Sequence, residues 1–245
     1  MLHVSEIGTG VVDWSPAERR ARLAILPSRA YTDAQLDHYR GTPRSRLPSR
    51  APAGFSLRAR ASHDEPVGTL GFGFWNDPFT VSGGVLAAPS AVWFFYASQP
   101  GDMALAANVP GNGWKAATLN AGRWPAWLVA PAAAGAIALT RVPRLGRPVM
   151  QLARRFAQAH ERLLDDVALS AWHHYRLLWT PYEAIFWVDG VERLRAPAPP
   201  AGPLGFVLWI DNQYAIASRD GRFGFGLCSL TEPQWLEVAD LQLSL

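Results

Sequence analysis

Apolar and polar residues alternate along several short segments of this chain. In residues 54–62, Phe55, Leu57 and Ala59 alternate with polar side chains, and a glycine begins the segment. Alternation with period two between turn-forming residues is typical of antiparallel strands. Alternating or short apolar runs predict further strands within residues 68–78, 91–98, 173–180, 182–190, 202–211, 222–230 and 235–245. This number of short strands predicts an all-β fold of two packed antiparallel sheets.

Two segments depart from this alternation. Residues 147–166 carry apolar side chains at helical spacing, with Pro148 in the first turn, and predict one inserted amphipathic helix. Residues 31–41 begin near Thr32, a candidate N-cap, and end at Gly41, and they predict one or two helical turns.

The predicted organisation is a single β-sandwich domain over residues 1–245. Residues 1–53 form an N-terminal arm that packs on it, and residues 123–166 form an insertion made of an apolar segment and the helix. The apolar part, residues 123–143, is interrupted by three prolines and is either a packed crossover or a hydrophobic lid. As a lid it would offer a surface for peripheral contact with lipid or with a partner.

Composition narrows the functional class. Hydrophobic residues make up 49% of the chain and charged residues 18%, which predicts a folded domain with a sizeable core. The net charge is +3, but the arginines are scattered, so we expect no nucleic-acid partner. The 11 tryptophans must line either a core or a ligand groove. No apolar run has the length of a transmembrane segment, and none is expected.

The cysteine content and the first residues bear on location and cofactors. Cys228 is the only cysteine, so no internal disulfide forms, and a lone thiol fits a reducing cytoplasm. The first residues lack the pattern of a signal peptide, which also favours a cytoplasmic protein. No HxH or HExxH spacing occurs, and no phosphate-binding or dinucleotide-binding motif is present, so neither a metal nor a cofactor is expected.

The segment WHHYRLLWTPYEAIFWVDG, residues 172–190, resembles glucanases of glycoside hydrolase family 16 in the concanavalin A-like superfamily. There a Trp-His-x-Tyr strand precedes a Trp-Thr-Pro turn and a strand that ends in Val-Asp-Gly. Residues 54–62, 68–78 and 202–211 resemble further strands of that family. The resemblance covers about residues 54–245 and implies a concanavalin A-like jelly-roll β-sandwich.

The catalytic motif of that family is absent from the segment that should carry it. The family places Glu-x-Asp-x-Glu, or Glu-x-Asp-x-x-Glu, on one strand, and retaining hydrolysis needs two carboxyl groups about 5–5.5 Å apart. The corresponding segment here is residues 91–98, which contains Trp93 and Phe95 and no carboxylate. We therefore expect no hydrolysis of the family type.

Two rows of alternating residues provide replacement candidates. One row ends in Trp75 and Asp77 and the other in Trp209 and Asp211, and the first row contains two glycines that leave room for a ligand or a bulky neighbour. The two aspartates are candidate catalytic acids, because indole rings nearby would raise the pKa of a carboxyl group. Alternatively, both tryptophans belong to the core and both aspartates begin turns.

Further candidate residues lie on other segments. His173 is a candidate acid or base, although its neighbour His174 must face the opposite side of a strand. Lys115 is a candidate amine beside Trp114, or a solvated loop lysine. The predicted ligand-binding set comprises Trp75, Trp93, Phe95, Trp114, Lys115, Trp209, Asn212 and Tyr214.

Three functional hypotheses follow from these residues. The first is an intracellular protein that binds or processes a small molecule, an apolar metabolite or a sugar, in an aromatic cleft without retaining hydrolysis. Its chemistry would be that of a non-classical isomerase or cyclase. The second is a divergent glycosidase or lyase that uses relocated acids, and the third is a lectin-like carbohydrate-binding module. The sequence leaves all three open, because fold alone does not give function.

Overall fold

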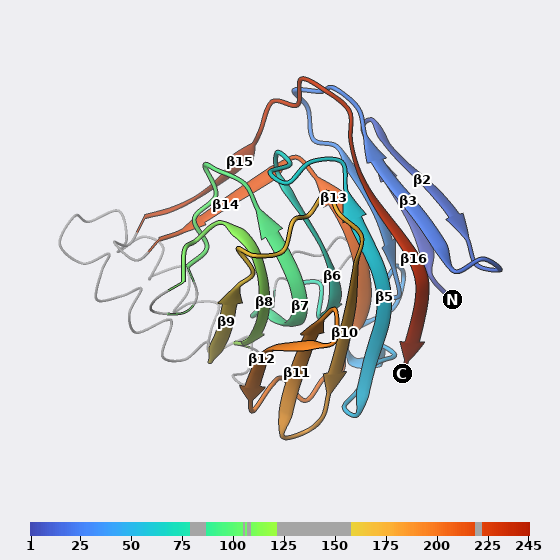
Figure 1. The fold of residues 1–245 in the computed structure, drawn as a ribbon, viewed down its shortest axis with the longest axis vertical. Helices are drawn as coiled ribbons and strands as arrows, with labels where there is room; N and C mark the ends of the chain where they lie inside the picture. The colour runs from blue at the N-terminus through green and yellow to red at the C-terminus, as the bar shows by residue number, and fades with distance from the viewer. Residues whose placement is uncertain (79–86, 105, 107–108, 122–157, 219–221) are drawn as a thin grey trace.

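The computed structural model describes residues 1–78, 87–104, 106, 109–121, 158–218 and 222–245. These residues form two large antiparallel sheets that lie face to face (Figure 1). Sheet A has the order β1 (His3–Ile7), β4 (Asp33–Asp37), β13 (Gly205–Asp211), β6 (Thr69–Trp75), β7 (Ser90–Ala97), β8 (Gly113–Asn120) and β9 (Ala159–Leu163). The fold is the predicted all-β sandwich.

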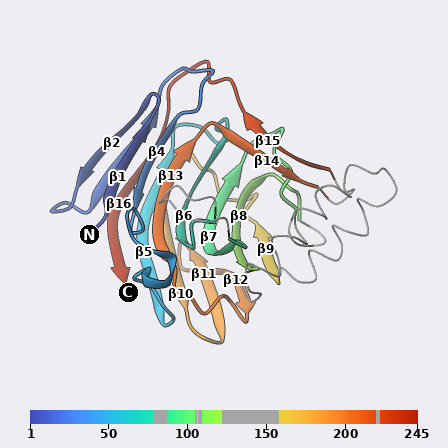
Figure 2. The same ribbon diagram turned by 180° about the vertical axis from the view of Figure 1, so that it is seen from behind.

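Sheet B has the order β12 (Val191–Pro197), β11 (Glu183–Val188), β10 (His173–Trp179), β5 (Ala53–Ala61), β16 (Gln234–Ser244), β3 (Arg20–Ile25) and β2 (Gly10–Ser15). A small hairpin of β14 (Gln213–Ala217) and β15 (Phe223–Leu227) extends to one side of the two sheets (Figure 2). A single turn of 3-10 helix, η1 (Arg44–Arg46), precedes β5.

The core lies between the two sheets and is built from the alternating apolar residues of both. Phe72 and Phe94 of sheet A each lie 5.1 Å from Tyr175 of sheet B, measured between ring centroids. Phe74 lies 5.5 Å from Trp179, which is fully buried. Edge-to-face and tilted ring contacts of this kind stabilise a core beyond simple burial of area. The alternation of apolar and polar residues along each strand therefore determines which face of the strand is buried in the core.

The strand predictions are confirmed, and Asp189 and Gly190 form the turn that joins β11 to β12. Residues 1–53, predicted as an arm, contribute β1 and β4 to sheet A and β2 and β3 to sheet B.

The helical turns predicted for residues 31–41 are wrong, because Asp33–Asp37 form strand β4 between β1 and β13. Ala34 and Leu36 are fully buried in the core, so this segment follows a period of two. Thr32 is not a cap, since its hydroxyl donates to the backbone oxygen of Ile7 and its N–H donates to Asn212. Tertiary pairing overrides the local helical signal here.

The helix predicted for residues 147–166 is wrong at its C-terminal end, and residues 147–157 lie outside the described residues. Ala159–Leu163 form strand β9, which pairs with β8 at the edge of sheet A. Periodicity within the segment cannot reveal that β8 offers an open edge for pairing. The apolar segment 123–143 also lies outside the described residues.

The outer face of sheet B, which is turned away from sheet A, carries tryptophans covered by arginines. The Arg22 guanidinium lies 4.6 Å from the Trp235 ring centroid, and Arg60 lies 5.2 Å from the same ring. Arg60 also lies 5.0 Å from the Trp172 ring. Both arginines also form ion pairs with Glu237. The Arg176 guanidinium lies 4.8 Å from the Trp187 ring centroid in another cation–π contact. These cation–π contacts let large rings remain half-buried on a solvated face.

Candidate functional site: the outer face of sheet A

The outer face of sheet A, turned away from sheet B, gathers four aromatic rings. Trp75 ends β6, Trp93 and Phe95 lie on β7, and Trp209 lies on β13. We call these four residues the aromatic cluster. The structure thus brings together four of the residues predicted to bind a ligand.

The rings of the aromatic cluster are in direct contact. Trp93 and Phe95 are stacked, with centroids 5.3 Å apart and planes inclined by 17°. Trp209 lies 5.4 Å from Trp93 and 6.0 Å from Phe95, and Trp75 lies 5.7 Å from Trp93. Trp93, Phe95 and Trp209 are 7–9% exposed, whereas Trp75 is half-buried. Trp75 therefore offers the most accessible surface of the cluster.

The glycines of β6 make room for these rings. A Cβ atom on Gly71 would lie 2.7 Å from Cη2 of Trp209, and one on Gly73 would lie 2.5 Å from Cβ of Trp93. The sequence left open whether these glycines admit a ligand or a bulky neighbour. The neighbour is present, because the indoles lie across β6 where it has no side chains.

Next to the aromatic cluster, β4 and β13 bring acidic side chains together. Asp33 lies directly opposite Asp211 in the antiparallel register, so their Cα atoms are about 4.5–5.5 Å apart and their side chains share one face. Gln35 and Asp37 follow Asp33 on the same face, and Nε2 of Gln35 donates to Oδ2 of Asp37 at 2.9 Å. We call Asp33, Asp37 and Asp211 the acidic edge.

A chain of hydrogen bonds links the acidic edge to the aromatic cluster. Nε1 of Trp209 donates to Oγ1 of Thr69 at 3.0 Å, and this hydroxyl donates to Oδ1 of Asp211 at 2.8 Å. The backbone N–H of Gln213 also donates to Oδ1 of Asp211, at 3.0 Å. Asp211 is thus anchored at the end of β13 and begins the turn into β14, as one reading of the sequence expected.

Burial changes the acidity of this carboxyl pair. Desolvation raises the pKa of Asp211 to about 6 despite the hydrogen bonds from Gln213 and Thr69. The pKa of Asp33 is raised well above its usual range by burial first, and then by the charges of Asp211 and Asp37. The Asp33 carboxylate accepts no hydrogen bond from the described residues. A buried pair of this kind favours a state in which at least one carboxyl group keeps its proton.

Asp77 and Asp211, predicted together as catalytic acids, lie at opposite ends of sheet A. Thr69 pairs with Asp211 and Trp75 pairs with Gly205, so the length of β13 separates the two ends. At about 3.3 Å per residue the separation is roughly 20 Å, far beyond the reach of paired catalytic carboxylates. Asp77 is buried, with φ of 44°, beyond the end of β6. The two aspartates therefore do not form a pair.

Lys115 lies on the outer face of β8, opposite Phe95 in the register. Its Nζ is 3.4 Å from Oε2 of Glu161 on β9, and both side chains are almost completely buried. Oε1 of Glu161 accepts the N–H of Ala106 at 2.8 Å. Lys115 is therefore a buried, ion-paired cation beside the aromatic cluster and not a solvated loop lysine.

The other predicted site residues lie elsewhere. Trp114 points into the core and contacts Phe94 and Tyr175. His173 lies on sheet B, where its Nδ1 is 2.5 Å from Oδ2 of Asp189, so it does not share the outer face of sheet A.

Asn212 and Tyr214 lie just beyond β13. Asn212 is fully buried and joins three segments, because it accepts from the N–H of Thr32 and donates to the oxygens of Ala30 and Cys228. Tyr214 lies in the β14–β15 hairpin, over Gly226.

The sequence analysis missed Asp33, Gln35, Asp37 and Glu161. The DAQLD segment does alternate, with Ala34 and Leu36 between polar residues, but the flanking Thr32 and Gly41 favoured a helix. Glu161 was placed within the predicted helix, where it would not reach Lys115. In the described part of the chain, no group of His, Cys, Asp or Glu side chains has an arrangement that could hold a metal ion. No helix among the described residues is long and apolar enough to cross a membrane.

Comparison with known proteins finds similarity in structure only. No protein-family model and no curated protein sequence matches the chain. The κ-carrageenase from Pseudoalteromonas carrageenovora, solved with an oligotetrasaccharide of κ-carrageenan, has a TM-score of 0.54 at 9% identity, over 99% of this chain and 88% of that chain. The β-glucanase from Bacillus licheniformis has a TM-score of 0.49 at 13% identity, over 100% and 92% of the two chains. A sialidase has a TM-score of 0.45 at 8% identity, and the match spans 99% of this chain and 17% of that chain.

The likeness to the carrageenase confirms the resemblance at the level of fold. The chain has a jelly-roll fold of two packed antiparallel sheets, like that of the carrageenase. At this identity the likeness says nothing about activity.

Proposed function

We propose that this protein binds a small molecule, a sugar or an apolar metabolite, against the aromatic cluster, and that it does not cleave glycosidic bonds by the retaining mechanism. One observation carries the proposal. The residues of β7 on the outer face of sheet A are aromatic or apolar, namely Ala91, Trp93, Phe95 and Ala97. Retaining hydrolysis needs two carboxyl groups about 5–5.5 Å apart at the scissile bond, and this strand supplies none.

Ring surfaces suit both proposed ligand classes. Indole rings stack on the apolar face of a sugar, and they also bury an apolar molecule at roughly 25 cal/mol per Å2. Trp75 is the most accessible ring of the cluster and would make the first contact. The oligotetrasaccharide bound by the structurally similar carrageenase supports a sugar as ligand. The proposal includes an intracellular location, which the single, buried thiol of Cys228 supports.

A second candidate function is acid-catalysed chemistry on a glycan or a related molecule. The observation that favours it is the register of β4 and β13, which sets Asp33 opposite Asp211 beside the aromatic cluster. A carboxyl group that keeps its proton near neutral pH is suited to act as a general acid. In this candidate Asp33 and Asp211 take the role that the sequence analysis gave to Asp77 and Asp211.

Ligand screening with matched variants tests the proposal. We expect thermal-shift and calorimetric titrations with κ-carrageenan oligosaccharides, laminarioligosaccharides and apolar polycyclic compounds to identify one class that binds. Trp75→Ala should weaken that binding at least about tenfold, because it removes the accessible ring. Trp235→Ala, which removes a half-buried ring from sheet B, is the matched control and should leave binding unchanged.

Two results would contradict the first candidate. Binding that is unchanged in Trp75→Ala would place the ligand elsewhere. Release of reducing ends from these glycans, lost in Asp211→Asn, would instead support the acid-catalysed enzyme.

A further inference from the structure

A pocket of about 510 Å3 lies at one end of the sandwich. One wall is made by the ends of three neighbouring strands of sheet A, where Asn76 follows β6, Ser90 begins β7 and Asn120 ends β8. Ser90 and Asn120 lie opposite each other in the register and continue the core-facing rows of β7 and β8. The pocket is therefore the open end of the space between the sheets and is separate from the aromatic cluster.

The opposite wall is the proline-rich segment 198–204, and it is held in place from both sides. Nε1 of Trp179 donates to the backbone oxygen of Pro200 at 2.9 Å. Ser49 and Leu204 exchange two backbone hydrogen bonds, each of 2.9 Å. Prolines have a fixed φ and no N–H, so this wall offers ring methylenes and backbone oxygens but few donors. Such a wall is preorganised for a ligand that donates hydrogen bonds.

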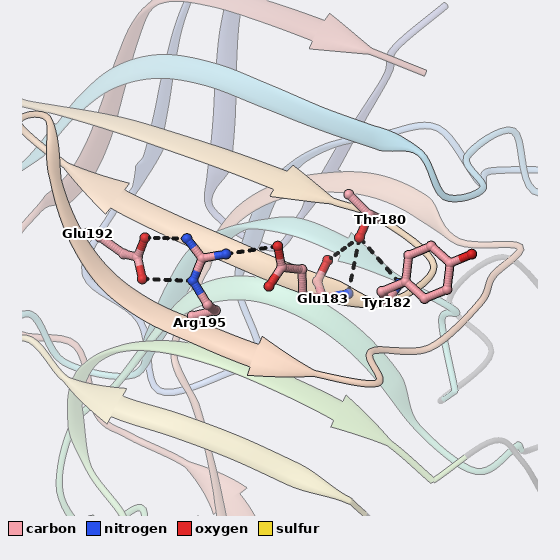
Figure 3. Close-up of polar contacts among 5 residues, drawn as sticks. All are labelled: Thr180, Tyr182, Glu183, Glu192 and Arg195. Carbon is pink, nitrogen blue, oxygen red and sulfur yellow. Dashed lines mark hydrogen bonds and ion pairs between the residues drawn. The ribbon is translucent and has the colours of Figure 1, made fainter.

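Beside the pocket, the turn from Thr180 to Glu183 is also fixed. Oγ1 of Thr180 accepts the N–H groups of Tyr182 and Glu183, at 3.2 and 3.0 Å (Figure 3). The adjacent Glu183 accepts from Arg195, which also forms an ion pair with Glu192, so β11 and β12 are joined across the surface. Pro181 of this turn lines the pocket, and the backbone oxygen of Tyr182 accepts the N–H of Ala198 in the proline-rich segment.

Asn120 is a buried polar group of the pocket with unused hydrogen-bonding capacity. Its Nδ2 is 3.5 Å from the backbone oxygen of Ala198, where the two walls of the pocket meet, which is long for a hydrogen bond. Its Oδ1 has no hydrogen-bond partner among the described residues, although the residue is only 7% exposed. By contrast, Asn76 uses its carboxamide within the wall, donating to Ala88 and accepting from Ser90. A carboxamide in this state accepts and donates hydrogen bonds in the way that sugar hydroxyl groups require.

The described lining of the pocket offers no ion-pair partner to a cationic ligand. None of the described residues that line it is acidic, and its charged residue is Arg44. Nε of Arg44 donates to the backbone oxygens of Asn76 and Asp77 at 3.0 Å, so the guanidinium is engaged in fixing the wall. Carboxamides, hydroxyl groups and proline rings then remain as the surface offered to a ligand.

We propose that this pocket is a second ligand site, independent of the aromatic cluster, that binds a neutral sugar of one or two rings, with Asn120 as the residue that recognises its hydroxyl groups. The volume suits a ligand of this size. The proline rings contact the apolar faces of the sugar, and the backbone oxygens of the segment accept from its hydroxyl groups.

Titration of the full chain with glucose, galactose, maltose and lactose, followed by two-dimensional amide NMR, tests this site. We expect at least one of these sugars to shift the resonances of Asn120, Ala198 and Ala201. Asn120→Ala should weaken that binding about tenfold, the equivalent of one lost hydrogen bond to a buried group. Asn112→Ala, a matched change outside the pocket, and Trp75→Ala, in the aromatic cluster, should leave it unchanged.

A second variant guards against loss of fold in Asn120→Ala. Ala201 is exposed and lines the pocket, so Ala201→Trp fills the opening without removing a hydrogen bond, and it should abolish the shifts. Sugar binding that is unchanged in both variants, or the absence of shifts at the pocket with all four sugars, would overturn the proposal. Binding of glucuronate more than tenfold tighter than glucose would overturn the neutral class of ligand. Loss of binding in Trp75→Ala alone would place the sugar on the aromatic cluster.

Discussion

The outer faces of the two sheets both carry tryptophans, but different side chains shield these rings from solvent on each face. On sheet A, Trp93 and Trp209 contact other rings and are 7–8% exposed. On sheet B, Trp172 and Trp235 are half-buried, and arginine side chains cover them. The first arrangement is a second apolar core, whereas the second is a solvated surface. The same residue type therefore has two roles. A ligand on sheet A would have to displace ring-to-ring packing, whereas a ligand on sheet B would displace only arginine side chains.

The largest expected difference between the two faces is in stability. Trp209→Ala should lower the free energy of unfolding by roughly 3–5 kcal/mol, because it leaves a cavity among packed rings and removes the donor to Thr69. Trp235→Ala should cost about 1 kcal/mol, since its ring is partly exposed and its contacts are with partly exposed arginine side chains. Urea denaturation of both variants measures this contrast. Equal losses would show that the two faces are not different in kind.

The acidic edge should make stability fall as pH rises. The pKa of Asp211 is about 6 in the folded protein and 3.8 in the reference state, so the folded protein binds this proton more tightly. The stability that protonation provides is fully present below about pH 4 and is lost as pH rises through 6. The shift corresponds to roughly 3 kcal/mol at most.

Asp211→Asn should remove the part of this pH dependence that Asp211 contributes, while the raised pKa of Asp33 keeps the rest, and it should raise stability at pH 7.5 by roughly 1–3 kcal/mol relative to the wild type. Urea denaturation at pH 4.5 and 7.5 measures the effect. Asp13→Asn, an exposed carboxylate on β2 of sheet B, is the control and should leave the profile unchanged. A wild-type protein that gains stability between pH 4.5 and 7.5 by an amount that Asp211→Asn abolishes would contradict the assignment.

Substitution of Gly71 tests whether the packing of the aromatic cluster requires β6 to have no side chain at this position. A Cβ atom there would lie 2.3 Å from the Phe94 backbone oxygen and 2.7 Å from the Trp209 ring, so Gly71→Ala should destabilise the fold by roughly 1–3 kcal/mol. Gly224→Ala is the matched control, because no atom lies within 4 Å of its Cβ position. Thermal unfolding and the near-ultraviolet spectrum of the two variants measure the effect. A stable Gly71→Ala would mean that the rings are free to move.

The smallest expected effect is on sheet B. Arg60→Ala removes contacts with Trp172 and Trp235 and an ion pair with Glu237, yet it should cost only about 1 kcal/mol, because the arginine is partly exposed and Glu237 keeps its ion pair with Arg22. The loss should shrink further at 1 M salt, where exposed charges are screened. A salt-independent loss would indicate that packing of the arginine stem, and not charge, holds these rings.

The strands could be predicted from the sequence because they depend on local alternation of apolar and polar residues. Trp93 and Phe95 were identified as ring residues on the relevant strand, and Trp75 and Trp209 as their partners. The partnership of Asp33 with Asp211 was not found, because it depends on the pairing of β4 with β13, which are far apart in the sequence. The pairing of Lys115 with Glu161 was missed for the same reason. Asp77 and Asp211 each follow a Trp-x pattern and looked equivalent in sequence. Only the antiparallel direction of β6 and β13 shows that the two aspartates lie at opposite ends of sheet A.

The contact between the indoles of Trp93 and Trp209 has an optical consequence. Their centroids are 5.4 Å apart and their planes are inclined by 42°, so their electronic transitions couple and share excitation. The circular dichroism spectrum should therefore contain an exciton couplet whose shape depends on the angle between the two rings. A ligand that tilts either ring would alter that couplet, which gives the protein a label-free reporter of occupancy within its own fold.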